Sequence, residues 1–231
     1  MPTSTLVPDA APGAPGTATP EARPLLRGWL HALAVLGVMA GGPLLLLRAP
    51  DTGAEVALSV YVLSMLALFG VSAAFHRVRW SPVARRRMRR ADHSTIFVGI
   101  AGTYTAVAVL ALSGWAEVCV LSIVWVGAAC GIAVRQVWLD LPKWAVAIPY
   151  LVVGWCALAV LPQLWRGLGP GGFALVLAGG VAYSVGAAVY GARRPSLVPG
   201  VFGYHELFHA CTVIGASLHY AALSAFALSR P

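Results

Sequence analysis

Charged side chains are scarce in this sequence. Only 10% of its 231 residues are Asp, Glu, Lys or Arg, whereas a soluble domain carries about a quarter. Hydrophobic residues make up 59% of the chain, and the mean hydropathy is +0.79. So few charges cannot cover a water-exposed surface. The composition therefore excludes an ordinary soluble domain and indicates a chain that lies mostly in lipid.

Paired cysteines are also missing. None of the cysteines has the close spacing of a zinc knuckle or a redox motif, and all fall inside apolar runs. We interpret them as small buried apolar residues. They are Cys119, Cys130, Cys156 and Cys211.

Acidic residues are few, with 8 Asp+Glu against 16 Lys+Arg. In a soluble protein this excess of positive charge would suggest a nucleic-acid partner. Here the basic residues lie between apolar runs, where the orientation of membrane loops explains them better. We therefore expect no nucleic-acid partner.

Seven apolar runs are each long enough to cross a membrane as a helix, which takes about 20 residues. Because lipid offers no partner for backbone groups, each run must be helical. The sequence predicts an all-α, seven-transmembrane helix bundle over residues 23–231, preceded by a disordered tail at 1–22. The sixth run is rich in Gly and Ala, which predicts a central helix. The runs are 28–47, 56–76, 92–112, 117–134, 144–162, 172–191 and 204–228.

Loop charge predicts the orientation of this bundle. With seven spans, one side of the membrane holds 13 of the 16 basic residues, which indicates a cytoplasmic N-terminus and an external C-terminus. The cluster Arg85–Arg90 contributes most to this bias. Ser81 can cap, and Pro82 can open, a short helix that leads into the third span. The cluster fixes the orientation of the bundle in the membrane, and it can also bind anionic lipid headgroups.

Ionisable residues inside membrane spans are costly, so each is a candidate for function. His76 ends the second run, Asp92 opens the third, and His205 and His209 open the seventh. All lie at the predicted cytoplasmic ends of their helices. Two imidazoles at positions i and i+4 can bind one zinc ion, and a third leaves an open position for water. Asp92 would then contact the water or orient an imidazole.

Two other interpretations stay open. Each histidine can simply be packed or hydrogen-bonded. We expect a buried, hydrogen-bonded role for His219, and we expect His31 and His93 to be supporting residues rather than ligands. The letters HELFH at 205–209 also match the HExxH motif of zinc peptidases, in which the glutamate is the general base. An intramembrane peptidase is therefore a rival. We expect Glu206 to hydrogen-bond nearby polar groups only.

Five ordered motifs resemble the hemolysin III family, the bacterial relatives of the progestin and adiponectin receptors. They are RGWLH at 27–31, SAAFHR at 72–77, DHSTIFVGIAGTYT at 92–105, GGVAYSVGAAVY at 179–190 and HELFHA at 205–210. One departure is Ala106, where the family often has proline. The likeness covers 24–228 and implies an integral, multi-pass protein of the plasma membrane, the inner membrane in a bacterium.

The resemblance implies zinc held by His76, His205 and His209, with Ser72 and Asp92 beside it. The wider superfamily includes alkaline ceramidases, so we expect a zinc-dependent hydrolase that acts on a membrane lipid amide or ester. In that role Asp92 would move the proton and Ser72 would hydrogen-bond the water or the oxyanion. A receptor with a structural zinc and a membrane-lytic protein remain alternatives.

Overall fold

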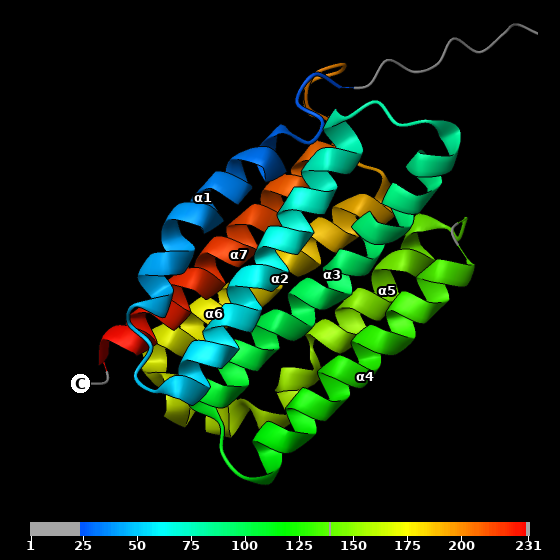
Figure 1. Ribbon diagram of the computed structural model, residues 1–231. Helices are drawn as coiled ribbons and strands as arrows, with labels where there is room; N and C mark the ends of the chain where they lie inside the picture. The colour runs from blue at the N-terminus through cyan, green and yellow to red at the C-terminus, as the bar shows by residue number, and fades with distance from the viewer. Residues whose placement is uncertain (1–23, 139, 230–231) are drawn as a thin grey trace, which may run out of the picture.

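The long apolar runs of the sequence fold as helices, because a helix satisfies its backbone hydrogen bonds within its own segment. The computed structural model describes residues 24–138 and 140–229 (Figure 1), and the tail predicted at 1–22 lies outside them. For the described residues the predicted all-α class is confirmed. The elements are α1 (Trp29–Leu46), α2 (Thr52–Arg77), α3 (Pro82–Ala111), α4 (Trp115–Val137), α5 (Lys143–Gly154), the 3-10 helix η1 (Cys156–Val160), α6 (Leu161–Ala192) and α7 (Tyr204–Ser229).

Six helical stretches among the described residues are long and apolar enough to cross a membrane. Five of them coincide with one predicted run each. The sixth, Trp144–Ala192, is 49 residues long and contains the predicted runs 144–162 and 172–191. It is interrupted by η1 and by Gly169, whose φ of 67° and ψ of 174° are not helical. The chain is thus an integral multi-pass membrane protein, and the count of seven crossings stays a prediction.

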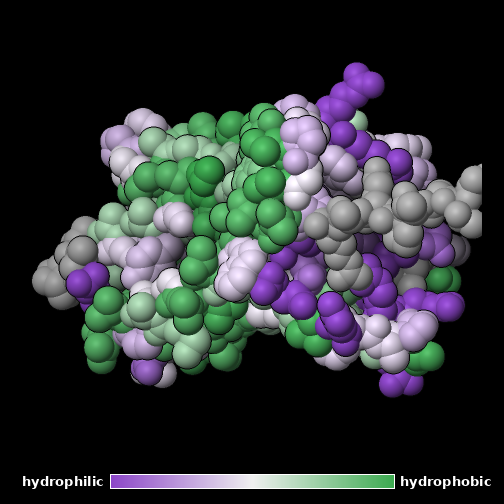
Figure 2. Space-filling model, turned by 90° about the horizontal axis from the view of Figure 1, so that it is seen from above, coloured by the Kyte–Doolittle hydropathy of each residue, from purple (hydrophilic) through white to green (hydrophobic). Residues whose placement is uncertain are grey.

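The outer face of the bundle is apolar, as expected for helices that contact lipid rather than water. Figure 2 shows hydrophobic residues over a broad part of the surface, with hydrophilic residues gathered toward one side. Large apolar side chains on several helices point outward. They include Leu33, Leu36, Met39, Leu63, Val118, Trp125, Val152, Leu177 and Ile214.

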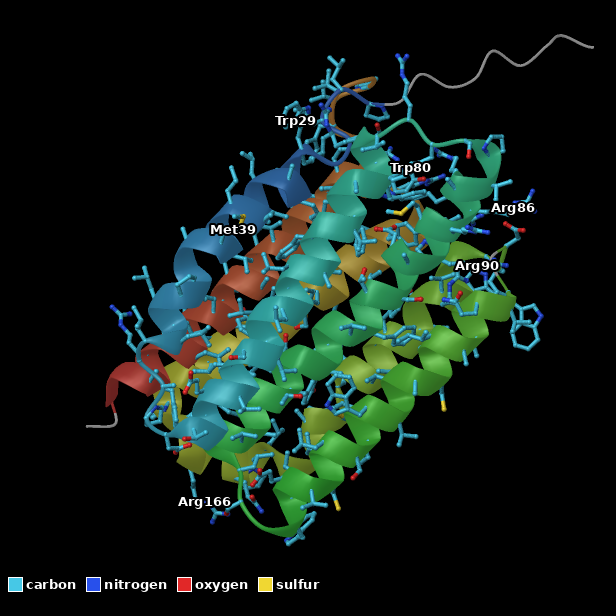
Figure 3. All side chains as sticks on the ribbon, in the orientation of Figure 1. Trp29, Met39, Trp80, Arg86, Arg90 and Arg166 are labelled. Carbon is cyan, nitrogen blue, oxygen red and sulfur yellow. The ribbon has the colours of Figure 1, made fainter. Side chains whose placement is uncertain are left out.

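The basic cluster lies on the first turns of α3, as the sequence predicts. Ser81 is the N-cap, its Oγ accepts a hydrogen bond from the Ala84 N–H at 3.3 Å, and Pro82 is the first helical residue. The short helix expected here continues without a break into the membrane span. In Figure 3, Arg86 and Arg90 lie toward the same end of the bundle as Trp80, whereas Arg166 lies at the opposite end.

The sixth run, which the sequence predicts to be central, buries fewer of its residues than α2 or α3. In the sixth run, only Gly179, Gly186 and Ala187 are buried, whereas α2 buries 11 residues and α3 buries 10. The small residues of α6 instead allow a close approach to α7. A Cβ at Gly179 would lie 2.4 Å from the His219 ring, and one at Gly215 would lie 2.7 Å from the Tyr183 ring. Each helix therefore places one aromatic ring against a glycine of the other.

Helices α2 and α3 form the enclosed centre of the bundle, and a glycine sets their separation. A Cβ at Gly102 of α3 would lie 2.1 Å from the Ser64 Oγ of α2 and 3.2 Å from the Val60 carbonyl oxygen. The Ser64 hydroxyl is itself fixed, since it donates a hydrogen bond to the Tyr61 carbonyl at 2.7 Å.

Gly102→Ala should therefore destabilise the protein by about 1–3 kcal/mol, because the added methyl group overpacks the interface. Gly70→Ala is the matched control. Gly70 is also helical, a Cβ there would meet nothing within 4 Å, and the change should stabilise by about 0.5–1 kcal/mol. Unfolding in detergent, followed by circular dichroism, measures both. Equal effects of the two substitutions would contradict this account of the α2–α3 contact.

Candidate metal centre

Three imidazoles converge where α2 ends and α7 begins. His76 lies in the last turn of α2, and His205 and His209 occupy the first two turns of α7. Their candidate ligand nitrogens all lie within 4.8 Å of one another. His209 is buried, and the other two are partly buried. The i, i+4 spacing on α7 thus does what the sequence predicts, because it puts two imidazoles on the face that meets α2.

The arrangement fits a small, tetrahedrally coordinated cation. The Nε2 atoms of His76 and His205 are 3.2 Å apart. With metal–nitrogen bonds of about 2.0–2.1 Å, two ligands of a tetrahedral zinc ion lie about 3.3 Å apart. Three imidazoles are also a donor set that zinc uses at catalytic sites, with one position left open. The residues present therefore fit the metal that the sequence motifs imply.

Ser72 and Asp92 border the same region. Both are buried, Ser72 one turn before His76 on α2 and Asp92 on α3. The Ser72 hydroxyl hydrogen-bonds the Asp92 carboxylate. Both side chains line one cavity together with His205 and His209. The structure thus brings the predicted serine and aspartate to the space beside the histidines, and their chemical roles stay predictions.

This cavity is long and mostly apolar. Its lining on α3 runs from Asp92 to Val107, a distance of about 22 Å at a rise of 1.5 Å per residue. Ser72, Asp92, His205 and His209 lie at one end of the cavity, and the rest is lined mainly by apolar side chains, interspersed with Thr103, Tyr104, Ser184, Thr212 and His219. The apolar lining includes Leu68, Ile96, Ile100, Leu151, Leu158, Leu164, Phe173 and Val176.

His31 of α1 lies against the centre but cannot join it as a ligand. Its ring stacks on the His209 ring, with centroids 3.9 Å apart and an interplanar angle of 1°. A metal bound by an imidazole lies in the plane of that ring. Two parallel, stacked planes cannot both contain one ion, so His31 is not a fourth ligand, as expected.

Glu206 is the most deeply buried charged group near the centre, with 1% of its surface exposed. One carboxylate oxygen is paired with the Arg27 guanidinium Nε, and the other accepts the Gly203 N–H at 2.9 Å. Since α7 begins at Tyr204, the second contact is the glutamate half of a capping box. Glu206 hydrogen-bonds nearby polar groups, as expected.

The remaining two histidines have structural partners. The His219 Nε2 lies 3.0 Å from the Val176 carbonyl oxygen on α6, and the ring is buried, as expected. The His93 Nδ1 contacts the Arg135 guanidinium, and the His93 carbonyl accepts the Tyr150 hydroxyl at 3.0 Å.

The segment that precedes α1, residues 25–28, packs against the cluster of three histidines. The Leu25 and Leu26 N–H groups donate to the carbonyls of Gly200 and Val201, at 3.0 and 3.3 Å. Gly28 then adopts a left-handed φ of 81°, and a Cβ there would lie 2.8 Å from the His76 Cβ. Sequence reasoning missed this contact and the Arg27–Glu206 pair. The signal available was that a buried carboxylate in a span needs a cation.

Fold and site together define a class, a multi-pass helical membrane protein with three clustered histidines at one end of an apolar cavity. A family model described as haemolysin-III related matches residues 21–220, and the chain belongs to this family. The resemblance seen in the sequence motifs is therefore confirmed.

Two curated relatives carry the same family name. The chain is 34% identical to Hemolysin-3 of Bacillus cereus over 137 residues, which cover 59% of this chain and 62% of that protein, less than two thirds of its length. It is 27% identical to the Hemolysin-3 homolog of Bacillus subtilis (strain 168) over 204 residues, which cover 87% of this chain and 92% of that protein.

Gly28→Ala should weaken zinc binding by about 10–100-fold, the usual effect of disturbing a group that supports a metal ligand. Gly200→Ala is the matched control. Gly200 also has a left-handed φ, of 75°, but a Cβ there would meet nothing within 4 Å. Gly200→Ala should introduce the same backbone strain as Gly28→Ala, about 1–2 kcal/mol, but leave the zinc affinity unchanged. Competition with a chromophoric chelator measures both. A similar loss in both variants would show that strain alone is responsible.

Proposed function

We propose that this protein is a zinc-dependent hydrolase of a membrane lipid amide or ester. The observation that carries the proposal is the convergence of three imidazoles, two of which line one end of a long, mostly apolar cavity. A lipid is the substrate that matches such a space, because its chain can occupy the apolar part while its polar linkage lies beside the histidines.

In the proposed reaction, the histidines, Asp92 and Ser72 each have a separate role. His76, His205 and His209 would hold the ion, which when bound acidifies water and polarises a carbonyl. The Asp92 carboxylate would accept a proton from the attacking water. It would then give that proton to the leaving nitrogen or oxygen as the bond from the acyl carbon breaks. Ser72 would orient this carboxylate through its hydroxyl, which hydrogen-bonds it.

The position of Glu206 argues against the peptidase alternative. In an HExxH peptidase the glutamate must be free to take a proton from water. Here both carboxylate oxygens have partners, the Arg27 guanidinium and the Gly203 N–H, and the side chain is almost fully enclosed. A structural task for Glu206 leaves Asp92 as the carboxylate for proton transfer.

The names of the two relatives suggest a lytic activity, and a receptor with a structural metal is the other alternative. Neither requires Ser72 and Asp92 beside the histidines. Turnover of a defined lipid by the purified protein, abolished by a chelator and restored by zinc, separates hydrolysis from both.

The purified protein should contain about one zinc ion per chain. The double variant His205→Ala, His209→Ala should lose it, because two of three ligands are gone. Asp92→Asn should keep most of the metal and lower the hydrolysis of N-palmitoyl or O-palmitoyl lipids by about 10²–10⁴-fold.

Glu206→Gln is the control for Asp92→Asn, since it changes the other buried carboxylate near the centre. It should lower the thermal midpoint, because the ion pair with Arg27 is lost, but retain turnover. Zinc content by plasma mass spectrometry and product by liquid chromatography measure the outcomes. If Glu206→Gln loses activity on the 10²–10⁴-fold scale while Asp92→Asn keeps it, the peptidase interpretation replaces this one.

The finer topology is also a proposal: seven crossings, with a cytoplasmic N-terminus and an external C-terminus. Two features support it. The stretch Trp144–Ala192 is 49 residues long and broken by η1, which leaves room for two crossings. Arg86 and Arg90 also lie at one end of the bundle and Arg166 at the other (Figure 3), the asymmetry that sets orientation.

Reporter fusions at Pro2 and at Pro231 should report opposite sides of the membrane. An alkaline phosphatase fusion should be active only at Pro231, and a fluorescent protein that folds only in the cytoplasm should be bright only at Pro2. A fusion after Leu168, between the two halves of the 49-residue stretch, should behave like the one at Pro231. Both termini on one side would exclude seven crossings.

The basic start of α3 has a proposed partner as well. Arg86 and Arg87 are exposed, and this end of the bundle would be at the cytoplasmic surface. Anionic headgroups would bind there, each basic residue contributing about 1 kcal/mol.

A further inference from the structure

His31 is a buried histidine whose two ring nitrogens are both fully enclosed and have no hydrogen-bond partner among the described residues. Only 2% of the residue is exposed, and it lines the cavity that also contains Asp92 and His209. A neutral imidazole carries one N–H donor and one acceptor. Both are therefore withdrawn from water and left unmatched by the protein.

The ring is also held in a fixed plane. His209 stacks on one face at 3.9 Å, and Phe69 approaches at 5.1 Å with an interplanar angle of 60°. Contacts of this kind orient a ring without using its nitrogens. Because the stacking on His209 excludes His31 from the metal, a ligand role does not account for its two unmatched nitrogens.

We propose that His31 is a substrate-binding residue, whose imidazole hydrogen-bonds the polar linkage of the lipid that occupies the cavity. The inference rests on the proposed function for the presence of a lipid. It adds a contact beyond the predicted site residues. The His31 N–H can donate to a carbonyl oxygen, and its other nitrogen can accept from an amide or hydroxyl hydrogen. Its position beside His209 places that linkage next to the metal centre.

Two substitutions separate the nitrogens of His31 from its ring. His31→Phe keeps an aromatic ring for stacking on His209 and removes both nitrogens. His31→Gln removes the ring and restores one donor and one acceptor. Binding of palmitamide to the zinc-loaded protein in detergent is measured by native mass spectrometry, with zinc content and thermal midpoint recorded for each variant. Palmitamide has the amide group and the chain but needs no turnover to be detected.

The expected result is that His31→Phe retains its zinc and loses about tenfold in palmitamide affinity, the factor for one hydrogen bond of ordinary strength. His31→Gln should bind palmitamide more tightly than His31→Phe. Unchanged affinity in His31→Phe would overturn the inference, because the ring would then serve only in packing. Loss of zinc in His31→Phe would also overturn it, because His31 would then support the metal ligand through its nitrogens.

The outcomes also distinguish this inference from the proposed function. If the wild-type protein binds palmitamide in a His31-dependent manner but hydrolyses no lipid, the hydrolase assignment fails and the binding role stands. If the zinc-loaded wild-type protein does not bind palmitamide, the inference is overturned.

Discussion

The buried carboxylate of Glu206 constrains the whole polar end of this bundle. A charge in a membrane-spanning helix is tolerated only when it is paired, and its partner, Arg27, lies 179 positions away in the chain. That pairing brings the segment before α1 to the start of α7. Gly28 then passes over His76, and His31, four residues after Arg27, stacks on His209. The three clustered histidines are thus enclosed by a segment that contributes no predicted ligand.

The same pair shows how a short motif can change its meaning with its surroundings. HELFH offers two imidazoles and a carboxylate on consecutive turns of a helix, and the two imidazoles converge with a third, as a metal site requires. The carboxylate instead closes the capping box at the start of α7 and neutralises a guanidinium. A second carboxylate, Asp92, lies in the cavity on a different helix. The motif alone cannot tell whether its glutamate is a general base or a structural ion-pair partner. The contact with Arg27 identifies Glu206 as structural.

Sequence reasoning predicts the helices and the histidine cluster well, because both depend on local rules. Hydropathy fixes which residues lie in lipid, and the i, i+4 spacing fixes which imidazoles share a face. It fails where long-range packing decides. The small residues of α6 indicate a close helix contact, but not that the contact is with α7. Hydropathy does indicate a break near Gly169, which lies between the predicted runs 144–162 and 172–191, but it gives no sign of η1, which lies inside the first of them.

The contact between α6 and α7 has an evolutionary consequence. His219 lies against Gly179 and Tyr183 lies against Gly215, so each ring occupies the volume that a side chain on the opposite helix would need. Neither glycine can be replaced by a larger residue unless the opposing ring becomes smaller. The four positions are therefore coupled in two pairs, and substitutions within a pair should arise together in the lineage. Such paired changes would record this helix contact in sequences alone.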